Sequence, residues 1–118
     1  MQDRPNISTA IPKRRYQLGD YAATVLGEVE TSDPRHYRYI LALVPTGQRT
    51  PILYVTCEAT PPRESAAGAW RLRLINEAMA EVMDTADRWG DLDDFAEQGL
   101  KLAGQALGLQ REQVIRLL

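Results

Sequence analysis

His36 and Cys57 are the only histidine and the only cysteine in the chain, so they are the first pair to consider for catalysis. A thiolate beside an imidazole is a nucleophile, and both residues fall in neighbouring segments that we expect to be strands. However, Cys57 alternates in phase with Leu53 and Val55, which is typical of a small core residue. We therefore predict a buried, unreactive thiol. One histidine and one cysteine are too few ligands for a structural zinc site, and we predict no cofactor or metal.

A run of acidic residues near the middle of the chain raises the question of a cation site, because carboxylates are ligands for hard cations. The run consists of Glu77, Glu81, Asp84, Asp87, Asp91, Asp93, Asp94 and Glu97. It lacks the alternate-residue spacing and the closing glutamate of a calcium loop. We interpret it as helix caps and a solvated surface, with contact to a basic protein partner as the functional alternative.

The segment DPRHYRYILALVP, residues 33–45, interleaves basic and aromatic side chains before it becomes aliphatic. A strand that binds single-stranded nucleic acid carries outward aromatic rings flanked by arginines. In an extended chain, Tyr37 and Tyr39 share a face with Leu41, so we favour a half-buried strand with a solvated arginine end. The alternative is a nucleic-acid-binding surface. Its residues would be Arg14, Arg15, Tyr16, Arg35 and Arg38.

The C-terminal segment LKLAGQALGLQREQVIRLL resembles the DNA-binding helix-turn-helix motif in the spacing of its small and apolar residues. The matching positions are Ala103, Gly104, Leu107, Gly108, Leu109, Val114 and Leu117. The resemblance implies that Gln110, Arg111, Gln113 and Arg116 lie on a recognition helix. Because the neighbouring segments are acidic and phosphate contacts dominate DNA binding, we favour an ordinary helical hairpin.

The elements that must position these residues begin with three strands, over 21–30, 35–44 and 52–58, joined by the turn sequences TSDP and PTGQRTP. A fourth strand is predicted over 69–75, where apolar residues alternate with Arg71 and Arg73. These four segments predict an antiparallel meander.

Helices are predicted in the last third of the chain. The segment 77–89 has a helical apolar period and a helix-favouring composition, with an extended 78–84 as the alternative. Asp91 is suited to cap the next helix, which Gly108 ends, and a last helix is predicted over 110–118.

Composition and charge place the chain among ordinary globular proteins, with 44% hydrophobic residues, 25% charged residues and a net charge of -2. The charge is uneven: residues 1–75 hold ten basic and seven acidic residues, and residues 76–118 hold four and nine. Such a dipole suits self-association or the orientation of a partner. The absence of an apolar leader or membrane span and the single cysteine lead us to expect a cytoplasmic protein that does not bind membranes.

We therefore expect an α+β fold, with an antiparallel three- to four-stranded meander followed by two or three C-terminal helices packed on one face. Residues 1–12 are predicted to be a flexible N-terminal arm, and residues 13–118 a single α+β domain. The motifs of phosphate loops, nucleophile elbows and metalloprotease helices are missing from the sequence, which favours a protein without catalytic activity. An enzyme or small-ligand site, with groups converging from distant positions, is the third alternative.

The predicted function is that of a non-enzymatic protein-interaction or adaptor domain that self-associates as a homodimer. The predicted interface consists of the apolar C-terminal residues Val114, Ile115, Leu117 and Leu118. The alternative function is nucleic-acid binding, through the arginine and tyrosine end of the sheet or through the C-terminal hairpin.

Overall fold

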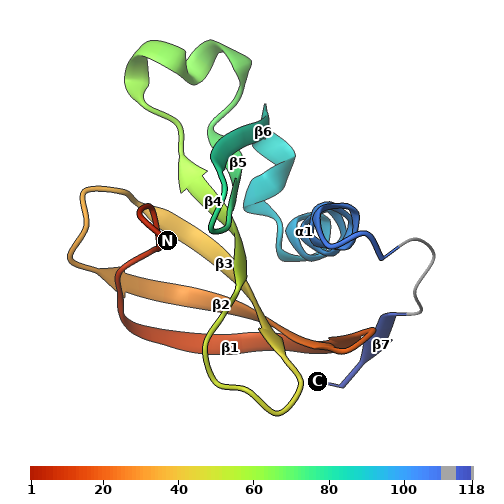
Figure 1. The fold of residues 1–118 in the computed structure, drawn as a ribbon. Coiled ribbons are helices and arrows are strands. Elements are labelled where there is room, and N and C mark those ends of the chain that lie inside the picture. The colour runs from red at the N-terminus through yellow and green to blue at the C-terminus, as the bar shows by residue number, and fades with distance from the viewer. Residues whose placement is uncertain (110–113, 118) are drawn as a thin grey trace.

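The computed structural model describes residues 1–109 and 114–117 and shows one curved antiparallel sheet with a single α-helix packed against it (Figure 1). The strands are β1 (Ile7–Leu18), β2 (Tyr21–Thr31), β3 (Tyr37–Pro45), β4 (Leu53–Ala59), β5 (Trp70–Ile75), β6 (Ala80–Ala86) and β7 (Val114–Arg116). The helices are the 3-10 segments η1 (Pro62–Ala67) and η2 (Asp87–Gly90) and the α-helix α1 (Leu92–Ala106). The strand order is β6-β5-β4-β3-β2-β1-β7, so the strands follow the chain except at β7.

The four predicted strands are present as β2, β3, β4 and β5, and their antiparallel pairing is confirmed. The predicted fold class is nevertheless wrong. The sheet has seven strands among the described residues instead of three or four, and one 15-residue α-helix stands in place of two or three helices. The sheet gains β1 on one side of the predicted meander and β6 and β7 at its two edges.

The α-helix predicted over 77–89 is wrong: Ala80–Ala86 form β6, which pairs antiparallel with β5 with one register shift, and the segment ends in the 3-10 turn η2. The turn that precedes β6 is closed by Asn76, whose side-chain oxygen accepts hydrogen bonds from the amides of Ala78 and Met79. Pairing with an open sheet edge supplies a full backbone ladder and outweighs the weak helix propensity of Ala, Met and Glu. The extended alternative for 78–84 is therefore correct.

The helix predicted over 110–118 is also wrong over the residues that the structure describes there. Val114–Arg116 form β7, which pairs antiparallel with the last residues of β1, and the amide of Leu117 donates to the carbonyl of Arg15 at 2.7 Å. The edge of β1 thus determines the conformation of this segment. Residues 110–113 and Leu118 lie outside the described part of the chain.

The N-terminal segment joins the sheet earlier than predicted, since β1 begins at Ile7, within the expected arm of residues 1–12. The residues before it are held by specific contacts: the amide of Asn6 donates to Asp33, and the Met1 side chain packs into an apolar cluster of the sheet. Pro12 lies inside β1, where a missing amide is tolerated because β7 pairs only with the far end of this strand.

The principal core lies between one face of the sheet and the helix α1. Asp91 caps α1 as predicted, accepting a hydrogen bond from the Asp94 amide at 3.1 Å. The fully buried Phe95 ring stacks on Tyr39 with 5.5 Å between the centroids. A Cβ at Gly99 would lie 3.1 Å from Leu41, so the glycine allows α1 to lie close to β3.

The opposite face of the sheet carries a smaller apolar cluster and the buried polar residues of the fold. The cluster consists of Tyr37, Ile40, Ala42, Tyr54 and Ile75, and Met1 and Ile7 pack against it. Strand β4 is consequently buried on both faces, from Leu53 to Glu58. A polar side chain in β4 must therefore find its partners within the protein.

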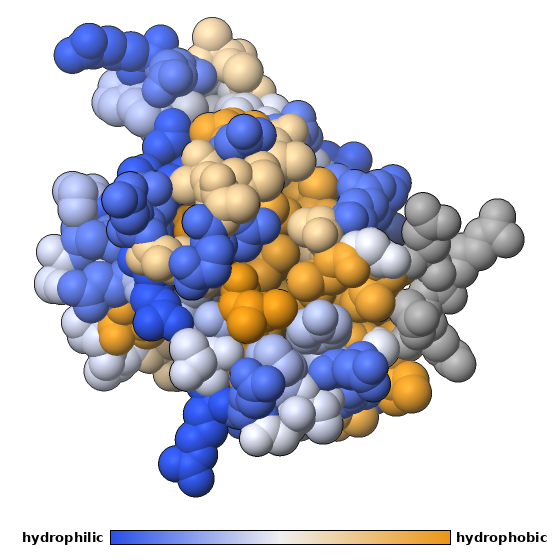
Figure 2. All heavy atoms as spheres, viewed as in Figure 1, coloured by the Kyte–Doolittle hydropathy of each residue, from blue (hydrophilic) through white to orange (hydrophobic). Residues whose placement is uncertain are grey.

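The surface in the view of Figure 1 is mixed in character. Figure 2 shows hydrophobic side chains in a band across the middle of this face, framed by hydrophilic ones, and a further hydrophobic group beside the grey atoms, where β7 lies. No helix in the described part of the chain has the length and apolar character needed to span a membrane.

We predict that Phe95→Ala lowers the free energy of unfolding by about 3 to 5 kcal/mol, because it empties a fully buried site between α1 and β3. The matched control is Lys101→Ala, an exposed position on the same helix, which should change stability by less than about 0.5 kcal/mol. Chemical denaturation followed by far-ultraviolet circular dichroism measures both. Equal stabilities of the two variants would contradict the packing described for α1.

Candidate functional site

The residues predicted to bind nucleic acid do not all lie on the surface. Tyr16 belongs to the core under α1 and is buried. The Arg14 guanidinium donates to Asp93 at 2.8 Å, and this hydrogen bond raises the pKa of Arg14 above its ordinary value. Arg15 is exposed on β1. The positive charge of Arg14 is thus partly neutralised by Asp93 of the protein itself. Nucleic-acid binding stays an untested prediction.

A bulge in β3 separates the two tyrosines that were expected to share a face. The register shifts between Tyr37, which pairs with Glu58, and Tyr39, which pairs with Cys57. Tyr37 therefore packs in the smaller cluster, while Tyr39 packs against the core under α1. The bulge residue Arg38 donates from Nε to the Gly90 carbonyl at 2.7 Å.

A shallow hollow of about 400 Å³ lies beside this bulge. Its lining residues are Lys13, Glu28, Val29, His36, Tyr37, Arg38, Tyr39 and Trp70. The Arg38 guanidinium lies over the rings of Tyr39 and Trp70, at 5.4 and 5.6 Å from their centroids. His36 stacks on Trp70 with 6.4 Å between the ring centroids. These rings already have stacking partners within the protein, so the hollow offers little free aromatic surface for a base.

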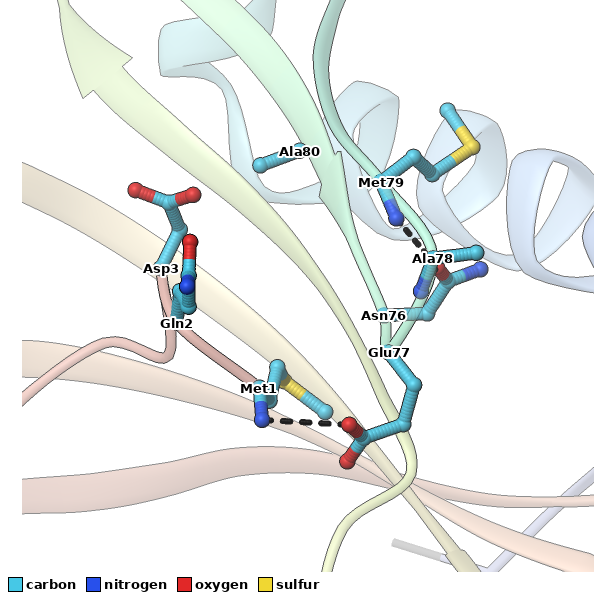
Figure 3. A pocket seen from close by; sticks show the side chains of 8 residues that line it. All are labelled: Met1, Gln2, Asp3, Asn76, Glu77, Ala78, Met79 and Ala80. Atoms are coloured by element: carbon cyan, nitrogen blue, oxygen red, sulfur yellow. Dashed lines mark hydrogen bonds and ion pairs between the residues drawn. The ribbon is translucent and has the colours of Figure 1, made fainter.

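A second hollow, of about 470 Å³, lies between the N-terminal residues and the β5–β6 turn (Figure 3). Met1, Gln2 and Asp3 line one side, and residues 76–80 line the other, as Figure 3 shows. The Met1 amino group forms an ion pair with Glu77 at 3.1 Å across the gap. Because Glu77 is largely exposed, this hollow lacks the buried, convergent polar groups expected of a catalytic site.

Cys57 and His36 do not form a nucleophile pair. The Cys57 thiol is fully buried and donates a hydrogen bond to the Trp89 carbonyl at 3.2 Å, whereas His36 lies on the exposed side of Trp70. Burial raises the pKa of the Cys57 thiol to about 12. The prediction that Cys57 is buried is confirmed, and its low reactivity stays a prediction.

The acidic run of residues 77–97 is dispersed over separate structural contacts. Asp84 accepts from the Trp89 indole, Asp87 accepts from the Ala69 amide, and Asp91 caps α1. Within the described ranges, no group of three histidine, cysteine or acidic side chains is arranged to hold a metal ion.

The strongest polar constellation is a buried carboxylate with three arginines, which we call the Glu58 cluster: Glu58, Thr56, Arg35, Arg71 and Arg73. Glu58 has 1% of its side chain exposed. Its Oε2 atom accepts from Thr56 at 2.6 Å and from Arg73 at 3.0 Å, and its Oε1 atom lies 3.3 Å from Arg35 and 3.6 Å from Arg71. The cluster therefore carries an excess of positive charge around one carboxylate.

Sequence reasoning missed the Glu58 cluster, apart from Arg35, although two of its signals were present. The alternation of β5 places Arg71 and Arg73 on one face, and β4 carries a glutamate in an otherwise apolar strand. Glu58 pairs directly with Arg71 across the two strands. An isolated charge in a buried strand, opposite a strand with paired arginines, is the pattern that indicates such a cluster.

A network of hydrogen bonds next to the cluster fixes the turn before β3. Asp33 accepts from the amides of Asn6 and Arg35 and from the Tyr37 hydroxyl. Burial alone would raise the pKa of Asp33, but these hydrogen bonds outweigh it and the pKa lies below its ordinary value. Burial, and then the hydrogen bond to Asp33, raise the pKa of Tyr37. The turn thereby holds Arg35 toward Glu58.

The predicted interface residues lie at one edge of the sheet. Val114 and Ile115 belong to β7 and Leu117 follows it, and all three are exposed. Leu118 lies outside the described residues, as do Gln110, Arg111 and Gln113 of the helix-turn-helix resemblance. Arg116, the fourth residue of that resemblance, lies in β7 and not in a helix.

Comparisons with protein-family models, with curated proteins and with solved structures found no match to this chain. The functional argument therefore depends on the geometry of the chain itself.

We predict that Cys57 does not react with a disulfide reagent in the folded protein and reacts fully in denaturant, because the buried thiol keeps its proton. A rise in pH from the ordinary thiol pKa of 9.0 toward about 12 should lower the free energy of unfolding. The reason is that the thiol ionises at a lower pH in the unfolded chain than in the folded protein. Thiol titration and denaturant unfolding over this pH range measure the two effects. Cys57→Ala is the control and should show a smaller fall in stability; fast labelling of the folded protein would contradict the burial.

Proposed function

We propose that this protein is a self-associating interaction domain whose copies pair through the free edge of β7. The observation that carries the proposal is a run of exposed apolar side chains on both faces of one short edge strand. Val114, Ile115 and Leu117 are 42%, 50% and 61% exposed, and they are three of the six large exposed hydrophobic residues in the described part of the chain. Clustered apolar exposure of this kind is typical of a contact surface.

The position of these residues in the sheet supports strand addition. β7 is the last strand in the sheet order and pairs with β1 on one side. No strand of the described residues pairs with its other edge, whose backbone amide and carbonyl groups are a template for another strand. Backbone hydrogen bonds would supply affinity, and the exposed apolar side chains would add contact area.

A second copy of the chain suits this edge because the strand is self-complementary. Antiparallel pairing of two β7 strands about Ile115 sets Ile115 opposite its counterpart and Val114 opposite Arg116. No two like charges then face each other, and one twofold axis relates the copies.

The other free edges are less suited to pairing between copies. The part of β1 beyond β7 contains Pro12 and several register shifts, which blunt an edge. β6 exposes Val82 and Met83 but also carries Glu81 and Asp84, so two β6 strands brought together would gather negative charge.

We expect the protein to form a dimer whose mass does not depend on salt, and Ile115→Asp to shift it toward monomer, because the substitution places paired carboxylates at the centre of the contact. Light scattering over a range of protein concentrations, at low and high salt, measures this. Val82→Asp is the matched control, since Val82 is as exposed as Ile115 but lies on the opposite edge.

Three outcomes would contradict the proposal. The wild type could be monomeric at every concentration, or Val82→Asp could dissociate the dimer while Ile115→Asp leaves it intact. A gain in mass with mixed oligonucleotides at low salt, lost at high salt, would instead favour the nucleic-acid alternative.

A further inference from the structure

Arg71 stands out in the Glu58 cluster because one of its buried donors forms no hydrogen bond with the described residues. A guanidinium has five donors, yet the two ion pairs of Arg71, to Glu58 and Glu64, are 3.6 and 3.8 Å long, which exceeds hydrogen-bond length. Its Nε atom is buried and has no hydrogen-bond partner among the described residues. By contrast, Arg73 donates to Glu58 at 3.0 Å.

A second buried donor without a partner lies on the same side of the sheet. The Thr60 hydroxyl is buried, and no described residue forms a hydrogen bond with it. The Thr60 amide donates to the Ala69 carbonyl, so the ladder between the β4 and β5 chains continues past the Glu58–Arg71 pair. Because side chains alternate along an extended chain, Thr60 shares a face with Glu58 and lies next to Arg71. Unpaired buried donors in native proteins call for an explanation, and a missing acceptor explains both.

The charge around Arg71 indicates what kind of acceptor is missing. Three guanidinium groups surround the single buried carboxylate of Glu58. The only other carboxylate within ion-pair distance among the described residues is Glu64, which lies on η1 with 66% of its side chain exposed. A loosely held, exposed carboxylate of this kind can be displaced by a ligand.

We propose that the Glu58 cluster is a binding site for a small-molecule oxyanion, a carboxylate or a phosphate group, which Arg71 binds in place of Glu64. The oxygens of such a group accept two parallel hydrogen bonds from a guanidinium, here from Nε and one Nη of Arg71. The Thr60 hydroxyl and Arg35, whose side chain is about one third exposed, supply further donors beside it. Glu58, held by Arg73 and Thr56, fixes the arginines in place and does not compete for the ligand.

This site is independent of the proposed self-association. The cluster is built on β4, β5 and the residues before β3, and two strands, β2 and β1, separate β3 from β7 in the sheet. Loss of the dimer in Ile115→Asp should therefore leave anion binding unchanged.

The test is a titration of the ¹⁵N-labelled full chain with inorganic phosphate, and separately with succinate, at constant ionic strength, followed by the Nε–Hε signals of the arginines. We expect a saturable shift of the Arg71 signal with at least one of the two ions, and the ion that binds more tightly identifies the group the site takes. Arg71→Gln should abolish the saturable shifts of the neighbouring amides. The matched control Arg49→Gln, an exposed arginine in the β3–β4 loop, should leave them unchanged.

Glu64→Gln keeps the test decisive if Arg71→Gln lowers stability, because Glu64 is exposed and its change does not disturb the core. Removal of the competing carboxylate should tighten binding by roughly two- to fivefold, the size expected of an exposed ion pair. The proposal is overturned if neither ion causes a saturable shift in the wild type or in Glu64→Gln. It is also overturned if a folded Arg71→Gln binds as tightly as the wild type.

Discussion

In the part of the chain that the structure describes, one α-helix covers a seven-stranded sheet, and most of the structure follows from that constraint. A sheet is stable when its apolar face is buried, and α1 achieves this on one side, where Phe95 packs on Tyr39 and Gly99 permits close contact with β3. The other side is closed by N-terminal residues and by the polar side chains around Glu58. The central strand β4 is therefore shielded from water on both faces.

A carboxylate in such a strand is costly to bury unless it is fully paired, and this accounts for the arrangement around Glu58. Its arginine partners come from the segment before β3 and from β5, so the ion pairs connect three consecutive parts of the sheet. A slip of one residue in either ladder would turn Glu58 or the arginines toward the opposite face. The cluster thus helps to specify the register of the sheet, in addition to its proposed role in binding.

Local sequence signals correctly predicted the elements in which residue propensity and tertiary contacts favour the same conformation. Alternation and turn residues located β2 to β5, and Asp91 located the start of α1. The same signals failed at β6 and β7, where helix-favouring residues meet an open sheet edge whose hydrogen bonds come from distant strands. Among the site residues, the exposed Val114, Ile115 and Leu117 were predicted from their apolar character, but the strand that presents them was not. The charges of the Glu58 cluster are visible in the sequence of β4 and β5, but its assembly depends on the β4–β5 register and on the position of Arg35, which is 23 residues away in the chain.

The strand order carries a consequence for the way in which the fold assembles. From β1 to β6 each strand pairs with the next one in the chain, so six strands can form by adding one hairpin at a time. The pairing of β7 with β1 is different, because it closes a loop of nearly the whole chain and contributes only three residue pairs. β7 is therefore expected to dock last during folding and to detach first during local opening. The edge of β1 then becomes accessible while the remaining six strands stay paired, so the chain can exchange its terminal strand for another without unfolding its core.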